Sequence, residues 1–221
     1  MTTQNDRSKE FKKIYESNYW FNSQVSKDKV EVQTESKSGK GSTLEQTKVI
    51  RMEIPLLLKN LNVKIMFDAA CGDFNWMKHV DLGNIKYIGA DIVPDLIEQN
   101  NKLYANQNRS FVVRDVVSDD LPKSDLIYCR DCLVHLPMAD IFTALRNFKK
   151  SGAKYLLTTT FMSNRINNLN VVVGNWQPLN LMGEPFNLPK PIYVINENCT
   201  EAGGNYSDKS LALWDLSTLK L

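Results

Sequence analysis

The 221-residue sequence is poor in cysteine, with four, and has neither a long apolar run nor a large net charge. So few cysteines in a chain of this length favour a reducing compartment over a disulfide framework. No run of 18 or more apolar residues occurs, so we expect no membrane-spanning helix. The polar residues after Met1 predict no secretory signal. These absences together favour a cytoplasmic protein.

The near-balanced charge, +2 at pH 7, gives no electrostatic argument for a nucleic-acid partner. The sequence also lacks the pattern G-x-G-x-x-G, which counts against a nicotinamide dinucleotide. Cys129 and Cys132 form a C-x-x-C pair, but no second ligand pair is spaced for zinc. We therefore predict no metal centre. The need for a divalent metal is left open by four acids whose oxygens are possible Mg²⁺ ligands: Asp119, Asp120, Asp131 and Glu197.

What the chain does contain is a regular alternation of apolar runs and helical patterns. Strands are expected at 64–69, 86–91, 110–115, 124–130 and 153–160, and helices at 74–80, 94–105 and 138–150. Such alternation predicts an α/β fold with a buried parallel sheet. Two later apolar runs, 191–196 and 210–216, predict an antiparallel hairpin. Between the two groups, the irregular residues 161–190 are long enough to be either a functional or a disordered loop.

The amino-terminal residues have a different character. Apolar side chains recur at helical spacing over 6–20, and polar residues with several glycines and serines follow over 22–42. Ser42 or Thr43 is expected to cap a helix that continues to about Leu61. We therefore divide the chain into a helix with a flexible lid or linker, 1–42, and one domain, 43–221. The first helix would either dock permanently on the domain or close over a ligand, and the glycines favour closure.

Acidic residues follow the expected strands in order. The first strand runs into the segment Asp68 to Asp73, the second ends at Asp91, and the third ends at Asp115. Ligands of an open parallel sheet lie beyond the carboxyl ends of its strands, so this series predicts a binding site and not isolated turn caps. An apolar strand, a tight turn and a second strand ending in an acid are typical of a unit that holds the ribose of a cofactor.

These residues resemble class I S-adenosylmethionine-dependent methyltransferases over about residues 43–160, and the closing hairpin fits as well. Asp68-Ala-Ala-Cys-Gly-Asp73 is similar to the first motif of that family, Asp91 to its ribose-binding acid and Asp115 to the acid that contacts adenine. The resemblance implies a Rossmann-like fold with a seven-stranded, mostly parallel sheet, and S-adenosyl-L-methionine as cofactor. The implied cofactor residues are Asp68, Ala70, Cys71, Gly72, Asp73, Trp76, Asp91, Ile92, Asp115, Val116 and Arg130, with Arg130 at the methionine end.

The sequence departs from that family in its glycines. The family's first turn has three, and only Gly72 is present here, with Ala70 and Phe74 in the other places. Alanine still allows close approach to a ligand. Phe74 indicates that the following helix begins differently.

The segment Arg130-Asp131-x-x-x-His135-Leu resembles the corresponding segment of phosphobase N-methyltransferases. Methyl transfer requires an aligned acceptor that loses a proton, a role that suits histidine. We therefore predict that His135 and Asp131 activate the acceptor, and the analogy suggests Tyr19 as a catalytic partner. The alternative is that His135 is structural, as we expect of the other histidine, His79.

The irregular loop contributes Trp176 and Asn180, and aromatic and amide side chains together suit a sugar. The form of the first motif is also similar to that of methyltransferases from glycan clusters. We predict O-methylation of a sugar hydroxyl in glycan biosynthesis, on a small-molecule or glycan acceptor. Three alternatives stay open: N-methylation of a small amine such as a phosphobase, a nicotinamide-dependent oxidoreductase, and a non-catalytic cofactor-binding module. A homodimer is also left open.

Overall fold

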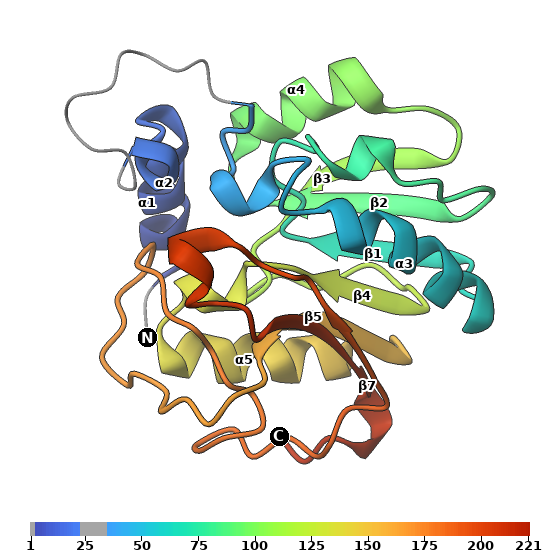
Figure 1. Cartoon of the computed structure of the whole chain (residues 1–221). Helices are drawn as coiled ribbons and strands as arrows, with labels where there is room; N and C mark the ends of the chain where they lie inside the picture. The colour runs from blue at the N-terminus through green and yellow to red at the C-terminus, as the bar shows by residue number, and fades with distance from the viewer. Residues whose placement is uncertain (1–2, 23–34) are drawn as a thin grey trace.

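The computed structural model describes residues 3–22 and 35–221 (Figure 1). Its helices are α1 (Gln4–Glu16), α2 (Tyr19–Asn22), α3 (Lys48–Asn60), α4 (Pro94–Tyr104) and α5 (Met138–Lys150). Its strands are β1 (Ile65–Ala69), β2 (Lys86–Asp91), β3 (Arg109–Val113), β4 (Leu126–Cys129), β5 (Tyr155–Phe161), β6 (Tyr193–Asn196) and β7 (Lys209–Asp215). Much of the expected linker, residues 23–34, lies outside the described residues.

The seven strands form one sheet in the order β3-β2-β1-β4-β5-β7-β6. Strands β1 to β5 are parallel, and β7 is antiparallel to both β5 and β6. This confirms the predicted Rossmann-like sheet with its closing antiparallel hairpin. Because β1 to β5 run in the same direction, their carboxyl ends meet at one edge of the sheet, as the arrowheads show (Figure 1).

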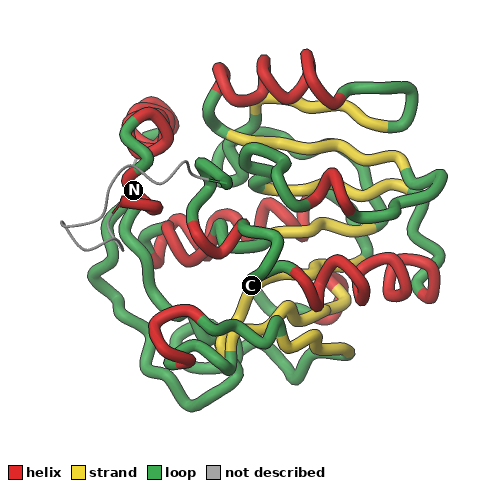
Figure 2. Tube along the Cα trace, turned by 45° about the horizontal axis from the view of Figure 1, so that its top comes forward, coloured by secondary structure: helices red, strands yellow, loops and turns green. Residues whose placement is uncertain are grey.

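Apolar side chains of the central strands alternate between two cores. Phe67 and Ile127 join the core under α5, whereas Met66 and Leu126 join the core under α3 and α4. All four are fully buried. The sheet is therefore covered on both faces, as expected for parallel strands and as the tube view shows (Figure 2).

The predicted helix over 74–80 is wrong. Only a 3-10 turn, Met77–His79, forms there. Phe74 has a positive φ of 57°, which a helix does not accept, and its ring packs edge-on against Phe111 with the centroids 5.1 Å apart. Burial of this aromatic ring outweighs the helical pattern of the segment.

Two other boundaries also differ from the expected ones. Asn18, with φ 51°, separates α1 from α2 within the predicted helix over 6–20. Helix α3 begins at Lys48, several residues after the expected cap, because the residues from Thr43 onward form turns in which the Thr47 hydroxyl donates to the Thr43 carbonyl at 2.8 Å. Neither difference changes the order of the elements.

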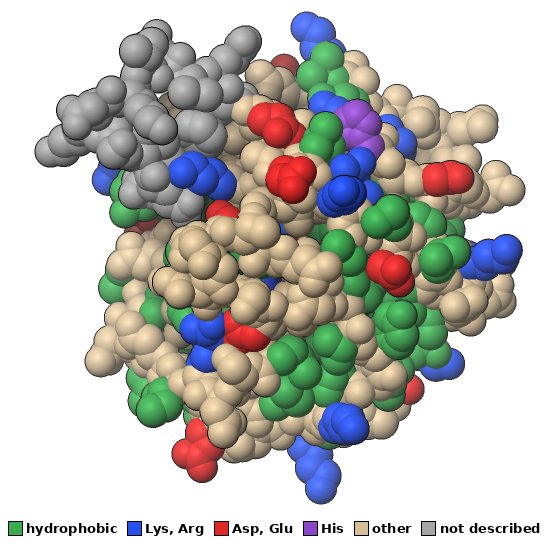
Figure 3. Space-filling model, viewed as in Figure 1, with side chains coloured by type: hydrophobic (Ala, Val, Ile, Leu, Met, Phe, Trp, Pro, Cys, Tyr) green, Lys and Arg blue, Asp and Glu red, His purple; other side chains and the backbone are tan. Residues whose placement is uncertain are grey.

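Among the described residues, no helix is both long and apolar enough to cross a membrane. On the face seen in Figure 3, the described basic and acidic side chains are interspersed, without a broad basic surface. This agrees with the small net charge of +2.

Candidate active site

A cavity of about 1070 Å³, including its open mouth, lies beyond the carboxyl ends of β1, β2 and β4. All of the cofactor residues predicted from the sequence line it: Asp68, Ala70, Cys71, Gly72, Asp73, Trp76, Asp91, Ile92, Asp115, Val116 and Arg130. The fold thus brings these residues together around one space.

Two carboxylates stand at the base of this cavity. The Tyr87 hydroxyl donates to Asp68 at 2.5 Å, and Asp91 accepts the backbone N–H of Gly72 at 3.3 Å and of Val93 at 3.1 Å. Burial raises the pKa of Asp68 to about 7, with the charge of Asp91 adding to it, and burial raises the pKa of Asp91 to about 6. Both groups therefore change charge close to neutral pH.

The turn after β1 passes close to the amino-terminal segment, and one of its positions has space only for glycine. Gly72 has a φ of 54°, and a Cβ there would lie 2.4 Å from the Ser38 Oγ. Segment 36–38 is fixed over this turn, because Ser36 donates to Asp73 at 2.9 Å and Asp73 N–H donates to Ser38 at 3.0 Å. The amino-terminal segment therefore forms part of the cavity wall.

The polar groups of this cavity fit a nucleoside cofactor that carries hydroxyls and an amine. Among the described residues, Asp68 Oδ1 and the Tyr128 hydroxyl are buried without a hydrogen-bond partner, and both side chains line the cavity. Leaving such groups unpaired is costly, so a ligand with donors and acceptors would satisfy them. The accepting oxygens of Asp91 suit a pair of ribose hydroxyls.

Helix α1 supplies a residue that the sequence analysis missed. Arg7, which is 3% exposed, forms ion pairs with Asp115 at 2.6 Å and with Asp140 at 3.2 Å, and it lines the cavity. Arg7, Phe11 and Ile14 share one face of α1 by helical spacing. A lone arginine on an apolar face was the available signal.

A second cavity of about 1410 Å³ adjoins the first. Trp20, Ser38, Asp131 and His135 line both cavities, so the two spaces meet there. The predicted residues Tyr19 and Trp176 line the second cavity. It also has aromatic and charged lining residues from distant parts of the chain, and these are Lys40, Phe161, Glu201, Tyr206 and Lys209.

His135 lies at this junction and is largely shielded from solvent. Its imidazole stacks on the Trp20 ring with the centroids 4.4 Å apart and 28° between the planes. Its Nδ1 is buried without a partner among the described residues. Burial lowers the pKa of His135 to about 4, although the charge of Asp131 opposes the shift. The imidazole is therefore neutral at pH 7, with Nδ1 open to accept a hydrogen bond, and burial makes it a weaker base than an exposed histidine.

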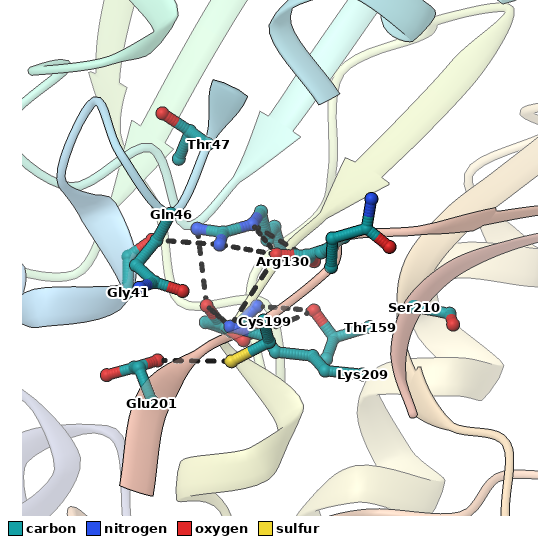
Figure 4. A network of polar contacts seen from close by, with 12 residues as sticks. Gly41, Gln46, Thr47, Arg130, Thr159, Cys199, Glu201, Lys209 and Ser210 are labelled. Atoms are coloured by element: carbon teal, nitrogen blue, oxygen red, sulfur yellow. Dashed lines mark hydrogen bonds and ion pairs between the residues drawn. The ribbon is translucent and has the colours of Figure 1, made fainter. Parts of the chain in front are cut away.

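Arg130 and Asp131 belong to an ion network, in which Figure 4 labels Arg130 and Lys209. Arg130 pairs with Glu197 at 2.6 Å and with Asp131 at 3.2 Å, and donates to the Gly41 carbonyl at 2.8 Å. Lys209 pairs with Asp131 at 2.6 Å. Much of the Arg130 guanidinium is thus already bonded within the protein, and Asp131 and Glu197, two of the acids considered for Mg²⁺, have cationic partners.

Asn180 is apart from the other predicted residues. Its Oδ1 accepts the N–H groups of Met182 at 3.0 Å and Gly183 at 3.1 Å, and its backbone N–H donates to Asn167 at 2.8 Å. It lines neither cavity described above. Its hydrogen bonds shape the loop that carries Trp176, so its effect on the site is indirect.

The described cysteines are all free thiols. Across residues 3–22 and 35–221, no three histidine, cysteine or acidic side chains are grouped as a metal site would need. His79, predicted to be structural, ends the 3-10 turn Met77–His79, and its N–H donates to the Trp76 carbonyl at 3.0 Å.

Comparison with solved structures places the fold among Rossmann-like methyltransferases, the class that the sheet order defines. The N-methyltransferase NodS from Bradyrhizobium japonicum WM9, in complex with S-adenosyl-L-homocysteine, matches with a TM-score of 0.60 at 15% identity over 91% of this chain and 97% of that one. Human N-acetylserotonin methyltransferase in complex with S-adenosylmethionine matches with a TM-score of 0.56 at 12% identity over 96% of this chain. This chain covers 56% of the length of that human enzyme.

The methyltransferase domain of bacterial CtHen1-CN also matches, with a TM-score of 0.56 at 12% identity over 78% of this chain and all of that domain. No protein-family model matches the sequence, and no curated protein matches it either. At such low identities the similarity establishes the fold, and the chemistry has to be argued from the site itself.

Proposed function

We propose that this protein is an S-adenosylmethionine-dependent methyltransferase that acts on a small polar acceptor. The observation that carries the proposal is the meeting of the two cavities at Asp131 and His135. The first cavity has the residues for a cofactor, and the second has room for an acceptor. NodS and the human enzyme, which share the fold, were crystallised with the demethylated cofactor and with the cofactor itself, respectively.

In this proposal Asp91 accepts hydrogen bonds from the ribose hydroxyls, Asp115 lies at the adenine end and Arg130 at the methionine end. The wall of the site includes the turn from Ala70 to Asp73 and the Trp76 ring. When bound, the cofactor supplies an electrophilic methyl group on a sulfonium. The protein's task is then to align an acceptor and to remove its proton.

His135 is the group we assign to proton removal. As the acceptor oxygen bonded to the methyl carbon, the bond from that carbon to the sulfonium sulfur would break and release a neutral thioether, and the acceptor's O–H proton would pass to the neutral imidazole. Asp131 accepts a hydrogen bond from the acceptor and fixes its orientation at the junction. Tyr19, which lines the second cavity and is 48% exposed, is placed to contact the acceptor from α2.

The composition of the second cavity supports a sugar hydroxyl as the acceptor, in glycan biosynthesis. The rings of Trp176 and Tyr206 lie 4.7 Å apart at 66°, and Phe161 adjoins both. Such rings offer apolar surface to the face of a sugar, and the polar side chains beside them pair with its hydroxyls. A small amine, methylated on nitrogen, is the second candidate, because the carboxylates of Asp131 and Glu201 line the same cavity.

The amino-terminal part of the chain is proposed to act as a lid on the domain over 43–221. Phe11, Tyr15 and Trp20 line the first cavity from α1 and α2. Because these side chains form part of the cavity wall, movement of α1 and α2 would open the cavity to a ligand. Closure would exclude water from the junction.

Titration calorimetry with S-adenosylmethionine and S-adenosylhomocysteine tests the cofactor site. We expect both to bind the wild-type protein, and we expect Asp91→Ala to lose that binding because the ribose loses its acceptor. The matched control is Asp120→Ala, an exposed acid that pairs with Lys150, which should bind as the wild type does. No binding of either ligand to the wild type would refute the proposal.

The acceptor is tested by offering sugar nucleotides and rhamnosyl glycosides beside phosphoethanolamine, with transfer of a labelled methyl group as the readout. We expect a sugar to be the better acceptor and Trp176→Ala to raise its KM. If phosphoethanolamine is preferred, the sugar proposal fails and the amine takes its place.

A further inference from the structure

Lys209 is a buried cation that the cofactor and acceptor assignments do not use. It begins β7, on the far side of β5 from Asp131 in the sheet order, and it is 5% exposed. Its ammonium lies 2.6 Å from Asp131 and 3.7 Å from Glu197. A buried lysine needs such partners, since burying an unpaired charge is costly.

Lys209 is one of four charges that balance one another at the carboxyl edge of the sheet (Figure 4). Arg130 and Lys209 are the cations, and Asp131 and Glu197 are the anions. Each anion contacts both cations. Three strand ends meet here, those of β4, β6 and β7, so the network fixes the hairpin relative to the site.

The Asp131 carboxylate is held in one orientation within this network. Its backbone has a φ of 52°, in the left-handed region, and its N–H donates to the Thr159 hydroxyl at 2.9 Å. The Thr159 hydroxyl also lies 3.4 Å from Asp131 Oδ1. The carboxylate therefore has contacts on both oxygens while its side chain lines both cavities.

Gly41 shows how tightly the amino-terminal segment covers this network. A Cβ at Gly41 would lie 3.2 Å from Asp131 Oδ2 and 3.4 Å from the Lys209 ammonium. Arg130 donates to the Gly41 carbonyl on the same side. The segment thus packs directly against the pair formed by Asp131 and Lys209.

We propose that Lys209 is a positioning residue that holds the Asp131 carboxylate ionised and directed at the junction of the two cavities. The inference rests on the proposed methyl transfer, in which Asp131 orients the acceptor. It assigns Asp131 a fixed negative charge and leaves the proton transfer to His135. It also makes β7 a part of the active site.

The charges that face Asp131 favour this assignment. Burial alone would raise the pKa of Asp131, but the charges of Lys209 and Arg130 outweigh it and hold that pKa well below its ordinary value. The other titratable groups around it are Glu197, Glu201, His135 and Tyr128. A group held in this way stays charged across the pH range in which His135 titrates.

The test is a carbon-13 NMR titration of the Asp131 carboxyl, assigned with Asp131→Asn, in the protein without added ligand. In the wild type we expect Asp131 to stay ionised throughout the acid range in which the fold persists. Lys209→Met should raise its pKa by at least about one unit, a tenfold change in the proton-binding constant. Lys209→Arg should restore the low value, and Lys150→Met, which removes an exposed lysine, should leave it unchanged.

Methyl transfer gives the second readout. Lys209→Met should lower kcat at least about tenfold with the acid limb of its pH profile moved upward, and Lys209→Arg should recover most of the rate. A wild-type Asp131 that titrates at the ordinary value would overturn the inference even if Lys209→Met did not fold. Failure of the proposed function is distinguished by the calorimetric titration, because the NMR measurement needs neither cofactor nor acceptor.

Discussion

Gly72 and Gly83 have nearly the same backbone conformation, with φ of 54° and 53°, but different surroundings. Nothing lies within 4 Å of the Cβ position at Gly83, whereas Ser38 occupies that position at Gly72. An alanine at either place bears the strain of a positive φ, and only at Gly72 does it also collide with the segment that closes the cavity. Comparing alanine substitutions at Gly72 and Gly83 therefore distinguishes the effect of backbone strain from that of a steric clash.

We expect Gly72→Ala to lose stability and to weaken binding of S-adenosylhomocysteine at least about tenfold, because Ser38 must move away from the turn. Gly83→Ala is the matched control and should lose about 1 kcal/mol of stability with unchanged binding. Calorimetry and thermal unfolding give both quantities. Adding Ser38→Gly to Gly72→Ala should recover part of the binding, and equal effects of the two alanines would contradict the steric account.

Helix α1 is attached to the domain by two buried side chains, Arg7 and Ile14, and by exposed polar contacts. Arg7 has Asp115 and Asp140 as its partners, on two different segments of the domain. Lys12 on the same helix also pairs with an acid, Asp95, but with side chains 43% and 59% exposed. Water screens the exposed pair of Lys12 and Asp95 but not the buried ion pairs of Arg7. The two sets should therefore differ greatly in the free energy that they contribute to docking of α1.

We expect Arg7→Met to loosen α1, because it leaves two buried carboxylates uncompensated at a cost of about 3 kcal/mol. Amide hydrogen exchange in α1 should accelerate, and unfolding should begin at a lower temperature. Lys12→Met is the control on the same helix and should leave α1 exchange close to that of the wild type. If both variants exchange alike, Arg7 does not hold the helix.

At the scale of the whole molecule, Asp68 and Asp91 link folding to pH. Their pKa values of about 7 and about 6 lie above the ordinary 3.8, so the folded protein binds more protons than the unfolded chain between about pH 4 and 7. Their contribution therefore favours the fold in acid and is lost as pH rises through about 6 to 7. The proposed ligand binding has the opposite requirement, because the ribose hydroxyls would donate to an ionised Asp91.

We therefore expect saturating S-adenosylhomocysteine to raise the Tm more at pH 7.5 than at pH 5.5. With a pKa of about 6, only about a quarter of Asp91 is ionised at the lower pH, which weakens binding roughly fourfold from this group alone. Thermal unfolding with and without ligand at the two pH values measures the effect. His135, with a pKa of about 4, titrates below this range. An equal Tm rise at both pH values would show that neither acid controls binding.

The sheet could be predicted because its signals are local. Each apolar run in 64–160 is short and bounded by turns, and helical patterns stand between several of them, a spacing that favours parallel strands with crossovers. Parallel strands place their carboxyl ends together, so Asp68, Asp91 and Asp115 had to meet at one edge. The grouping of the predicted cofactor residues around one cavity follows from this geometry.

The helix predicted over 74–80 does not form, and the cause lies in residues outside that segment. Phe74 packs between Tyr87, Tyr104 and Phe111, which arrive from other elements. The free energy of burying these rings together exceeds the small preference of a short segment for helix. The local pattern of apolar residues predicts helix or strand from its spacing. The prediction fails where contacts with residues distant in the sequence stabilise another conformation.

The sequence by itself determined the order of elements, the covered parallel sheet and the acidic edge, because each depends on residues close together in the chain. Only the tertiary structure decided the partners of the charged and aromatic groups at the site. Arg7 reaches Asp115 across 108 residues and Lys209 reaches Asp131 across 78. Ion pairs and ring contacts depend on distance in space, and no spacing along the chain encodes which strand end or helix face will lie opposite.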